Sequence, residues 1–155
     1  MTSETKLSVV LPVLAPTPFL RAMTEFAIKT LRMHADNPFE LIVVEAENDY
    51  FDPTHPALYK QWVVDKYLNF TPKIGGVKEL NAGVDAASGD IILSTGNDVI
   101  APPHWDMELL RCFEERKDCA VASLSAFEPG TVIGPRVAED RMVEGMYSPF
   151  MAFRR

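Results

Sequence analysis

The stretch Gly89-Asp-Ile-Ile-Leu-Ser-Thr-Gly-Asn-Asp-Val-Ile-Ala-Pro-Pro-His-Trp105 predicts the fold of this chain. Its apolar run from Ile91 to Leu93 is typical of a short buried strand, and polar residues then lead into Asn97-Asp98 before two prolines. In open α/β sheets, ligands bind beyond the carboxyl ends of the strands, and Asp98 has that position. A turn aspartate that caps the next helix is an equally good interpretation, because Asn and Asp are common in turns.

Predicted strands and helices alternate around this stretch. Apolar runs predict strands at 7–14, 39–44, 119–124 and 145–154, with a short edge strand at 71–76. Apolar residues at helical spacing predict helices at 17–31, 57–68, 77–88 and 104–117. A strand, a helix and a second strand in succession form a parallel, right-handed βαβ unit. We therefore expect an α/β fold with a mostly parallel sheet.

Proline and glycine residues refine these boundaries. Pro12 is expected to end the pairing of the first strand, and Gly89 to cap the helix at 77–88. Gly83 lies inside that helix, where glycine costs about 1 kcal/mol relative to alanine. Its presence there indicates close packing or a nearby ligand.

Length and composition predict one soluble domain over residues 1–155. The 15 Lys and Arg against 22 Asp and Glu give a net charge of -7, which argues against a protein that grips nucleic acid but leaves a nucleotide-sized ligand open. Cys112 and Cys119 lack metal-type spacing and are interpreted as reduced core thiols, which favours the cytoplasm. No segment approaches the ~18 apolar residues of a transmembrane helix.

Several short motifs follow one another along the chain. They are Ser8-Val9-Val10-Leu11-Pro12, Val43-Val44-Glu45 with Asn48-Asp49, Asn81-Ala82-Gly83, Gly89-Asp90, Gly96-Asn97-Asp98 with Pro102-Pro103-His104-Trp105, and Arg154-Arg155. Each motif alone is weak. Together, in this order and spacing, they resemble GT-A glycosyltransferases of the family 2 type over almost the whole chain. The resemblance implies a three-layer α/β/α sandwich and a single nucleotide-sugar-binding domain.

The resemblance also implies roles for particular residues. Pro12, Val13 and Leu14 would line the pocket for the base of a UDP-, GDP- or dTDP-sugar donor, and Glu45 would accept hydrogen bonds from base or ribose. Asp98 would hold a Mn²⁺ or Mg²⁺ ion that bridges the diphosphate oxygens. The complete set of implied nucleotide-binding residues is Pro12, Val13, Leu14, Glu45, Asn48, Asn81, Asn97 and Asp98.

The chain departs from the family pattern at two points. Gly96 stands where family members commonly have an acidic residue, so Asp98 is expected to act alone and to bind metal weakly or only with the nucleotide. The catalytic base of the family lies beyond the basic dipeptide, and no residue of this chain matches it. Glu139-Asp140 does not occupy that position and is interpreted as an exposed loop pair.

Three functions follow from these observations. The first is metal-assisted, inverting glycosyl transfer to an acceptor that the sequence does not identify. The second is a non-catalytic module that binds a nucleotide or nucleotide sugar. A nucleotidyltransferase ranks last, because the loop from Leu14 to Phe19 has neither the glycine nor the lysine that such a phosphate-binding loop needs. A homo-oligomer is possible.

Overall fold

The computed structural model describes residues 5–14, 17–46, 64–123 and 150–155. In these ranges the elements follow the order β1 (Leu7–Val13), α1 (Pro18–His34), β2 (Glu40–Ala46), β3 (Lys66–Phe70), α3 (Gly76–Ala86), β4 (Ile91–Thr95), α4 (Trp105–Glu115), β5 (Val121–Ser123) and β6 (Phe150–Arg154). No helix of the described ranges is long and apolar enough to cross a membrane.

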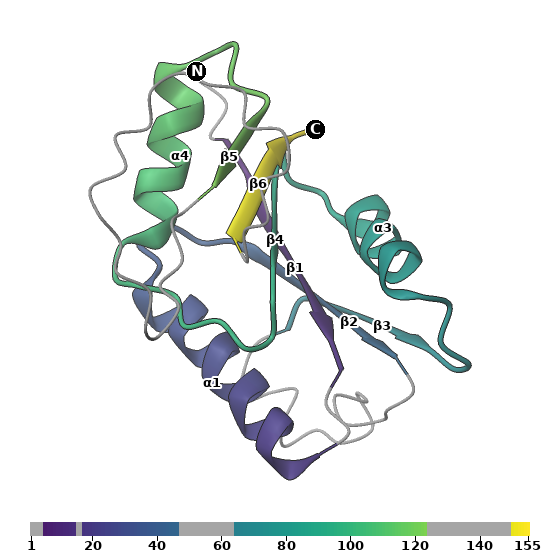
Figure 1. Ribbon diagram of the computed structural model, residues 1–155. Helices are drawn as coiled ribbons and strands as arrows, with labels where there is room; N and C mark the ends of the chain where they lie inside the picture. The colour runs from purple at the N-terminus through teal and green to yellow at the C-terminus, as the bar shows by residue number, and fades with distance from the viewer. Residues whose placement is uncertain (1–4, 15–16, 47–63, 124–149) are drawn as a thin grey trace, which may run out of the picture.

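The strands form one six-stranded sheet in the order β3-β2-β1-β4-β6-β5 (Figure 1). β1 pairs in parallel with β2 and β4, and β2 pairs in parallel with β3. β6 runs antiparallel to both of its neighbours, β4 and β5. The predicted α/β class with a mostly parallel sheet is therefore confirmed.

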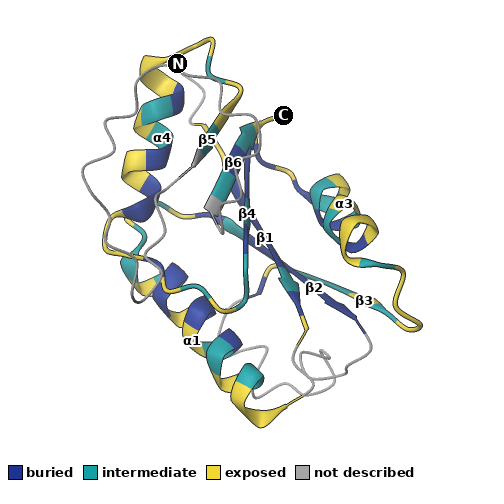
Figure 2. Ribbon diagram, viewed as in Figure 1, coloured by how far each residue is buried: buried dark blue, intermediate teal, exposed yellow. Residues whose placement is uncertain are grey.

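Helices cover both faces of the sheet, so the molecule has three layers (Figures 1 and 2). On one face, α1 and α4 bury their apolar sides against β1, β2 and β4, and the odd-numbered residues Val9 and Leu11 point into this core. On the other face α3 packs on β1, β2 and β3, and Val10 points toward it. This alternation follows from the two-residue side-chain repeat of a strand.

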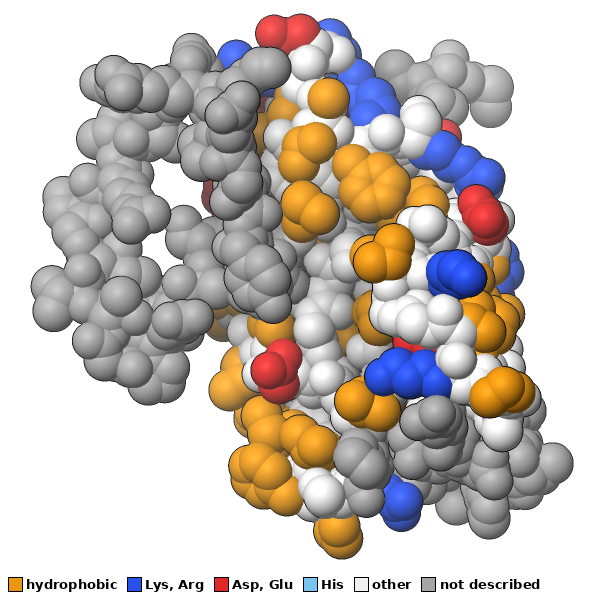
Figure 3. All heavy atoms as spheres, turned by 45° about the vertical axis from the view of Figure 1, so that its right-hand side comes forward, with side chains coloured by type: hydrophobic (Ala, Val, Ile, Leu, Met, Phe, Trp, Pro, Cys, Tyr) orange, Lys and Arg blue, Asp and Glu red, His pale blue; other side chains and the backbone are white. Residues whose placement is uncertain are grey.

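α3 leaves part of its face of the sheet uncovered. It packs on β1, β2 and β3, whereas Met151 and Phe153 of β6 and Val121 of β5 keep exposed surface, about half in the case of Val121. Hydrophobic side chains accordingly gather on the surface of the molecule that Figure 3 brings forward.

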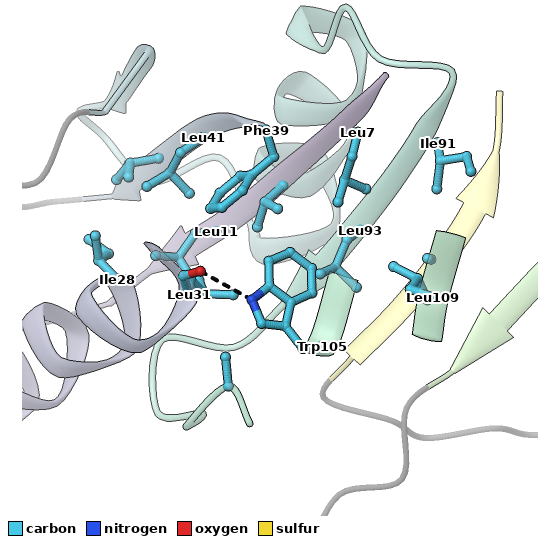
Figure 4. Packing of buried hydrophobic residues seen from close by; sticks show 14 of the residues in the cluster. Leu7, Leu11, Ile28, Leu31, Phe39, Leu41, Ile91, Leu93, Trp105 and Leu109 are labelled. Carbon is cyan, nitrogen blue, oxygen red and sulfur yellow. Dashed lines mark hydrogen bonds between the residues drawn. The ribbon is translucent and has the colours of Figure 1, made fainter. Parts of the chain in front are cut away.

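Trp105 joins the two helices of the larger core. Its side chain is 1% exposed, and its indole Nε1–H donates a hydrogen bond of 3.1 Å to the carbonyl of Leu31 in α1 (Figure 4). The ring of Phe39 meets it edge-on, with centroids 5.4 Å apart and an angle of 77° between the planes. Such an indole supplies a large buried area and still satisfies its polar atom.

The backbone of the segment between β4 and α4 is fixed to α1 by hydrogen bonds. Thr30 Oγ1 accepts from the N–H of Ala101 at 3.1 Å, and His34 Nδ1 donates to the carbonyl of Ala101 at 2.6 Å. The N–H of His104 then donates to the carbonyl of His34 at 2.9 Å. His104 is the N-cap of α4, with a φ of 62°, so Asp98 is not the cap of that helix.

The structure corrects two predicted elements. Residues 57–63 of the predicted helix at 57–68 lie outside the described part, and its end forms β3 instead. The edge strand predicted at 71–76 is wrong, because residues 71–75 connect β3 to α3 and Gly76 begins α3. Tyr67 and Leu68 satisfy a helical spacing and a strand equally well, so periodicity alone did not separate the two.

The roles of Pro12 and Gly89 also differ from expectation. Pro12 stays in β1 opposite Val44, and pairing on the other side of β1 stops at Val10, so the strand continues with one partner. α3 ends with Ala87 as its cap, and Gly89 is needed for space, since a Cβ there would lie 2.7 Å from the backbone nitrogen of Ser8.

The two cysteines are free thiols and lie close together. Cys112 and Cys119 are both partly exposed, with their Sγ atoms 3.9 Å apart. Burial raises the pKa of the Cys112 thiol, and the neighbouring Cys119 adds to this effect. They lie at the rim of the core rather than in it.

Gly83 marks the closest approach of α3 to the sheet. A Cβ at this position would collide with Cγ1 of Val10 and lie 2.9 Å from Cγ2 of Val44. We expect Gly83→Ala to lower the free energy of unfolding by about 1–2 kcal/mol, because overpacking outweighs the gain in helix propensity. Urea unfolding followed by circular dichroism measures this. Gly76→Ala on the same helix is the control: a Cβ there has open space, and unchanged or higher stability is expected.

Glu40 organises the amino edge of the sheet. Its Oε2 accepts hydrogen bonds from the Ser8 hydroxyl at 2.5 Å and from the Ser88 N–H at 2.8 Å, while Oε1 lies 2.7 Å from Lys66 Nζ. Burial acts to raise the pKa of Glu40, but the hydrogen bonds from Lys66, Ser8 and Ser88 outweigh it and hold the pKa at about 2.

The lowered pKa of Glu40 predicts part of the acid sensitivity of the protein. A carboxylate whose pKa is lower in the folded than in the unfolded state stabilises the fold above about pH 4.5, and this contribution disappears as the pH falls toward 2. Glu40→Gln should therefore cost about 1–3 kcal/mol at pH 7 and almost nothing near pH 2. Urea titrations from pH 7 to pH 2 test this. The same loss at every pH, or an equal pH dependence in Glu114→Gln, an exposed control, would contradict it.

Candidate nucleotide site

Most of the residues implied by the sequence motifs lie at the carboxyl edge of the parallel strands. Val13 is the last residue of β1 and pairs in register with Glu45 near the end of β2. Leu14 follows β1 directly and is 46% exposed. Asn97 and Asp98 form the turn that follows β4, on the other side of β1. This edge is the usual ligand position in an open α/β sheet.

A hydrogen-bonded bridge connects the turn after β4 to the segment after β1. Asn97 Nδ2 donates to Thr24 Oγ1 in α1 at 2.9 Å and to the carbonyl oxygen of Leu14 at 3.5 Å. Thr24 is fully buried. The sequence did not single out Thr24, and a threonine inside a helix carries no signal of such a contact.

The Asp98 carboxylate is exposed and lies over Gly96. A Cβ at Gly96 would be 2.6 Å from Asp98 Oδ1, so this oxygen occupies the space that a side chain at position 96 would need. A side chain at position 96 would therefore require the Asp98 carboxylate to move.

Glu45 is a buried carboxylate near the end of β2. It has no exposed surface, and its Oε2 accepts a hydrogen bond of 2.6 Å from the Tyr67 hydroxyl. The sequence analysis missed Tyr67 because it assigned this residue to the end of a predicted helix, where the structure has β3. A strand assignment would have placed it on β3 beside β2, where it pairs with Val43.

The remaining predicted residues are spread more widely. Pro12 lies in β1, and strand alternation points it to the α3 face, opposite to Val13. Asn81 is exposed on α3, which covers that same face. Asn48 lies outside the described residues, as do Glu139-Asp140. Of the predicted residues, the structure directly connects those in the turn after β4 with those at the end of β1. Where Asn48 and Glu139-Asp140 lie relative to this connection is not described.

The donor set suits a cation that also binds phosphate. In the described ranges no group of three or more His, Cys, Asp or Glu side chains could hold a metal ion. Mg²⁺ keeps several waters and takes one or two carboxylates together with phosphate oxygens. Asp98, with the Asn97 amide beside it, fits that demand only when a diphosphate supplies the other ligands.

A family comparison identifies the class of protein to which these features belong. The model for "Glycosyl transferase family 2" matches residues 8–151, which include all of β1 but its first residue, the Asn97-Asp98 turn and all the helices described above. The chain belongs to this family. A search among curated proteins found no similar sequence.

Three solved structures illustrate the similarity in fold. TarS 1-349 of S. aureus, in complex with UDP, has a TM-score of 0.73 at 17% identity, over 96% of this chain and 46% of that one. The mannosyltransferase PcManGT from Pyrobaculum calidifontis, in complex with GDP-Man and Mn²⁺, has a TM-score of 0.68 at 16% identity, over 99% and 46%. Glucosyl-3-phosphoglycerate synthase from Mycobacterium tuberculosis, with Mn²⁺, UDP and glucosyl-3-phosphoglycerate, has a TM-score of 0.56 at 20% identity, over 77% and 43%.

These likenesses concern the fold. At sequence identities this low, a shared fold does not identify the substrate. The chain also spans about half the length of these structures.

The Tyr67 hydroxyl is expected to stabilise the fold through Glu45. Tyr67→Phe removes a hydrogen bond to a buried carboxylate, and we expect the free energy of unfolding to fall by about 1.5–3 kcal/mol. Thr95→Val is the matched control, because Thr95 Oγ1 is buried without a hydrogen-bond partner in the described structure and its removal should be neutral or stabilising. Chemical denaturation of both variants at pH 7 measures the difference, and equal losses would contradict the assignment.

Proposed function

We propose that this chain is the nucleotide-sugar-binding domain of a glycosyltransferase that uses a nucleoside-diphosphate sugar. Leu14, which is exposed directly after β1, would contact the base, and Pro12 and Val13 of the same strand would hold it at this edge. Glu45 is fully buried and bonded to Tyr67, so it would support the end of β2 instead of contacting the ligand. Asn48, Asn81 and Asn97 would complete the nucleotide contacts.

The observation that carries this proposal is the contact between Asn97 and the carbonyl of Leu14. It brings the segment proposed to contact the base to the same place as the turn proposed to contact the diphosphate. A nucleoside diphosphate needs these two regions within the length of one ligand. Complexes of similar folds with UDP and with GDP-Man support a donor of this chemical class.

Asp98 is the residue proposed to hold Mn²⁺ or Mg²⁺ together with the diphosphate. Mn²⁺ in two of the similar structures supports this choice of ion. When bound, such an ion neutralises charge on the leaving diphosphate. The protein's own contribution is an exposed carboxylate held in a turn that is fixed to α1 through Asn97.

Burial favours one alternative function. Inverting transfer needs a base for the acceptor hydroxyl. Glu45 has no exposed surface with which to meet an acceptor, and Asp98 is assigned to the diphosphate. A module that binds the nucleotide sugar without completing transfer therefore stays the second candidate. Transfer of sugar to an acceptor, detected by mass spectrometry, would exclude it.

Substitution of Asp98 tests the proposed site directly. We expect calorimetry to detect binding of UDP or GDP in the presence of Mn²⁺, and Asp98→Asn to weaken it about tenfold or more, which corresponds to about 1.4 kcal/mol. Because Asp98 is exposed, thermal stability without ligand should stay unchanged.

The exposed Asp118 provides the control. Asp118→Asn removes an equal charge near the end of α4 and should leave nucleotide affinity as in the wild type. Failure of the wild type to bind any nucleoside diphosphate would refute the proposal, and so would unchanged Mn²⁺-dependent binding in Asp98→Asn.

A further inference from the structure

We propose that Thr24 of α1 is a positioning residue of this site. Its hydroxyl orients the side-chain amide of Asn97 so that the amide oxygen is available to a cation bound with the nucleotide. This inference rests on the proposed function and adds a second protein oxygen beside Asp98.

The hydrogen bonds of Thr24 define which role its hydroxyl has toward Asn97. Thr24 Oγ1 donates its hydrogen to the carbonyl of Leu20, one turn earlier in α1, at 2.8 Å. A hydroxyl has one hydrogen to donate but can accept through its lone pairs. Toward Asn97, at 2.9 Å, Thr24 is therefore an acceptor.

An acceptor at this place selects the amide nitrogen. Asn97 Nδ2 lies between two oxygens, Thr24 Oγ1 and the Leu14 carbonyl at 3.5 Å, and both can only accept there. An amide flipped by 180° would place Oδ1 against both of them and lose both hydrogen bonds. Since the nitrogen and oxygen diverge from the same carbon, Oδ1 is directed away from Thr24 and Leu14.

The location of Thr24 restrains the orientation of the Asn97 amide. The residue is fully buried and lies in the middle of the 17-residue helix α1. The same helix also holds Ala101 through Thr30, so the turn is fixed at a second point further along. Asn97 therefore has little freedom to choose another partner without breaking contacts with a rigid element.

The oriented oxygen compensates for Gly96. A turn with Gly96 and Asp98 offers one carboxylate where the family pattern commonly has two acidic positions. Amide oxygens, like carboxylates, are ligands of hard divalent cations. Asn97 Oδ1, on the residue that precedes Asp98, would thus supply a second oxygen donor without a second negative charge next to the diphosphate.

The decisive variant is Thr24→Val, which keeps the shape of the side chain and removes the acceptor. We expect the affinity for UDP with Mn²⁺ to fall about tenfold, as is typical when a group that orients a metal ligand is removed. Thr24→Ser, which restores the hydroxyl, should bind within about twofold of the wild type. The binding of UDP without Mn²⁺, in EDTA, should be the same in all three proteins.

Thr30→Val is the matched control. Thr30 also lies on α1 and accepts a hydrogen bond from the segment after β4, but at Ala101 instead of Asn97. This variant should lower the melting temperature and leave the affinity for UDP and Mn²⁺ unchanged. Loss of affinity in Thr30→Val equal to that in Thr24→Val would show a general structural effect and overturn the inference.

A ligand-free measurement separates this inference from the proposed function. The two Nδ2 protons of Asn97 give assignable NMR signals, and Thr24→Val should shift the one that is bonded to Thr24 whereas Thr24→Ser should not. If these signals do not respond, or if Thr24→Val binds Mn²⁺ and UDP like the wild type, the positioning role is wrong. If the wild type binds no nucleotide while the signals respond as expected, the proposed function has failed and the role toward a bound cation with it, whereas the orientation of Asn97 by Thr24 stands.

Discussion

The indole of Trp105 is the contact on which the larger core depends. It fills the space between α1, α4 and the sheet, and its one polar atom is paired with the Leu31 carbonyl, so a large buried ring costs no unsatisfied hydrogen bond. The segment from Thr95 to Trp105 is thereby held between β4 and α1. The packing of Trp105 therefore also positions the turn that carries Asp98. In this way the hydrophobic core supports the candidate site.

At the opposite edge of the sheet, two arginine side chains bind the carbonyl groups at the ends of helices. Arg154 at the end of β6 donates to the carbonyls of Phe113 and Lys117, both at 2.8 Å, and so meets the end of α4. Arg155 donates to the carbonyl of Ala87, the cap of α3, on the other face. Positive side chains at helix ends satisfy free carbonyls and interact well with the helix dipole. This basic dipeptide, interpreted from sequence as a family motif, thus joins both helical layers at the edge away from Asp98.

Sequence predicted the elements that have a strong period or an explicit cap. Thr17-Pro18 gave the start of α1, and the apolar run before Ser94 gave β4. It failed at β3, where a short amphipathic segment satisfied two periods at once. Chain order predicted that Glu45 lies near the end of β2 and Asp98 after β4, because both positions belong to the carboxyl edge of parallel strands; their role in a site stays a proposal. Contacts formed by tertiary packing, such as Thr24 with Asn97 and Tyr67 with Glu45, had no local pattern to reveal them.

The position of β6 affects the order in which the chain can assemble. β5 has β6 as its single neighbour in the described sheet, and β6 inserts between it and β4. During synthesis, β1 to β4 can pair as soon as they leave the ribosome, whereas β5 waits for residues 150–154. Ile91 and Arg154, partners in the register, are separated by most of the second half of the sequence, so we expect this part of the sheet to close late and slowly during folding.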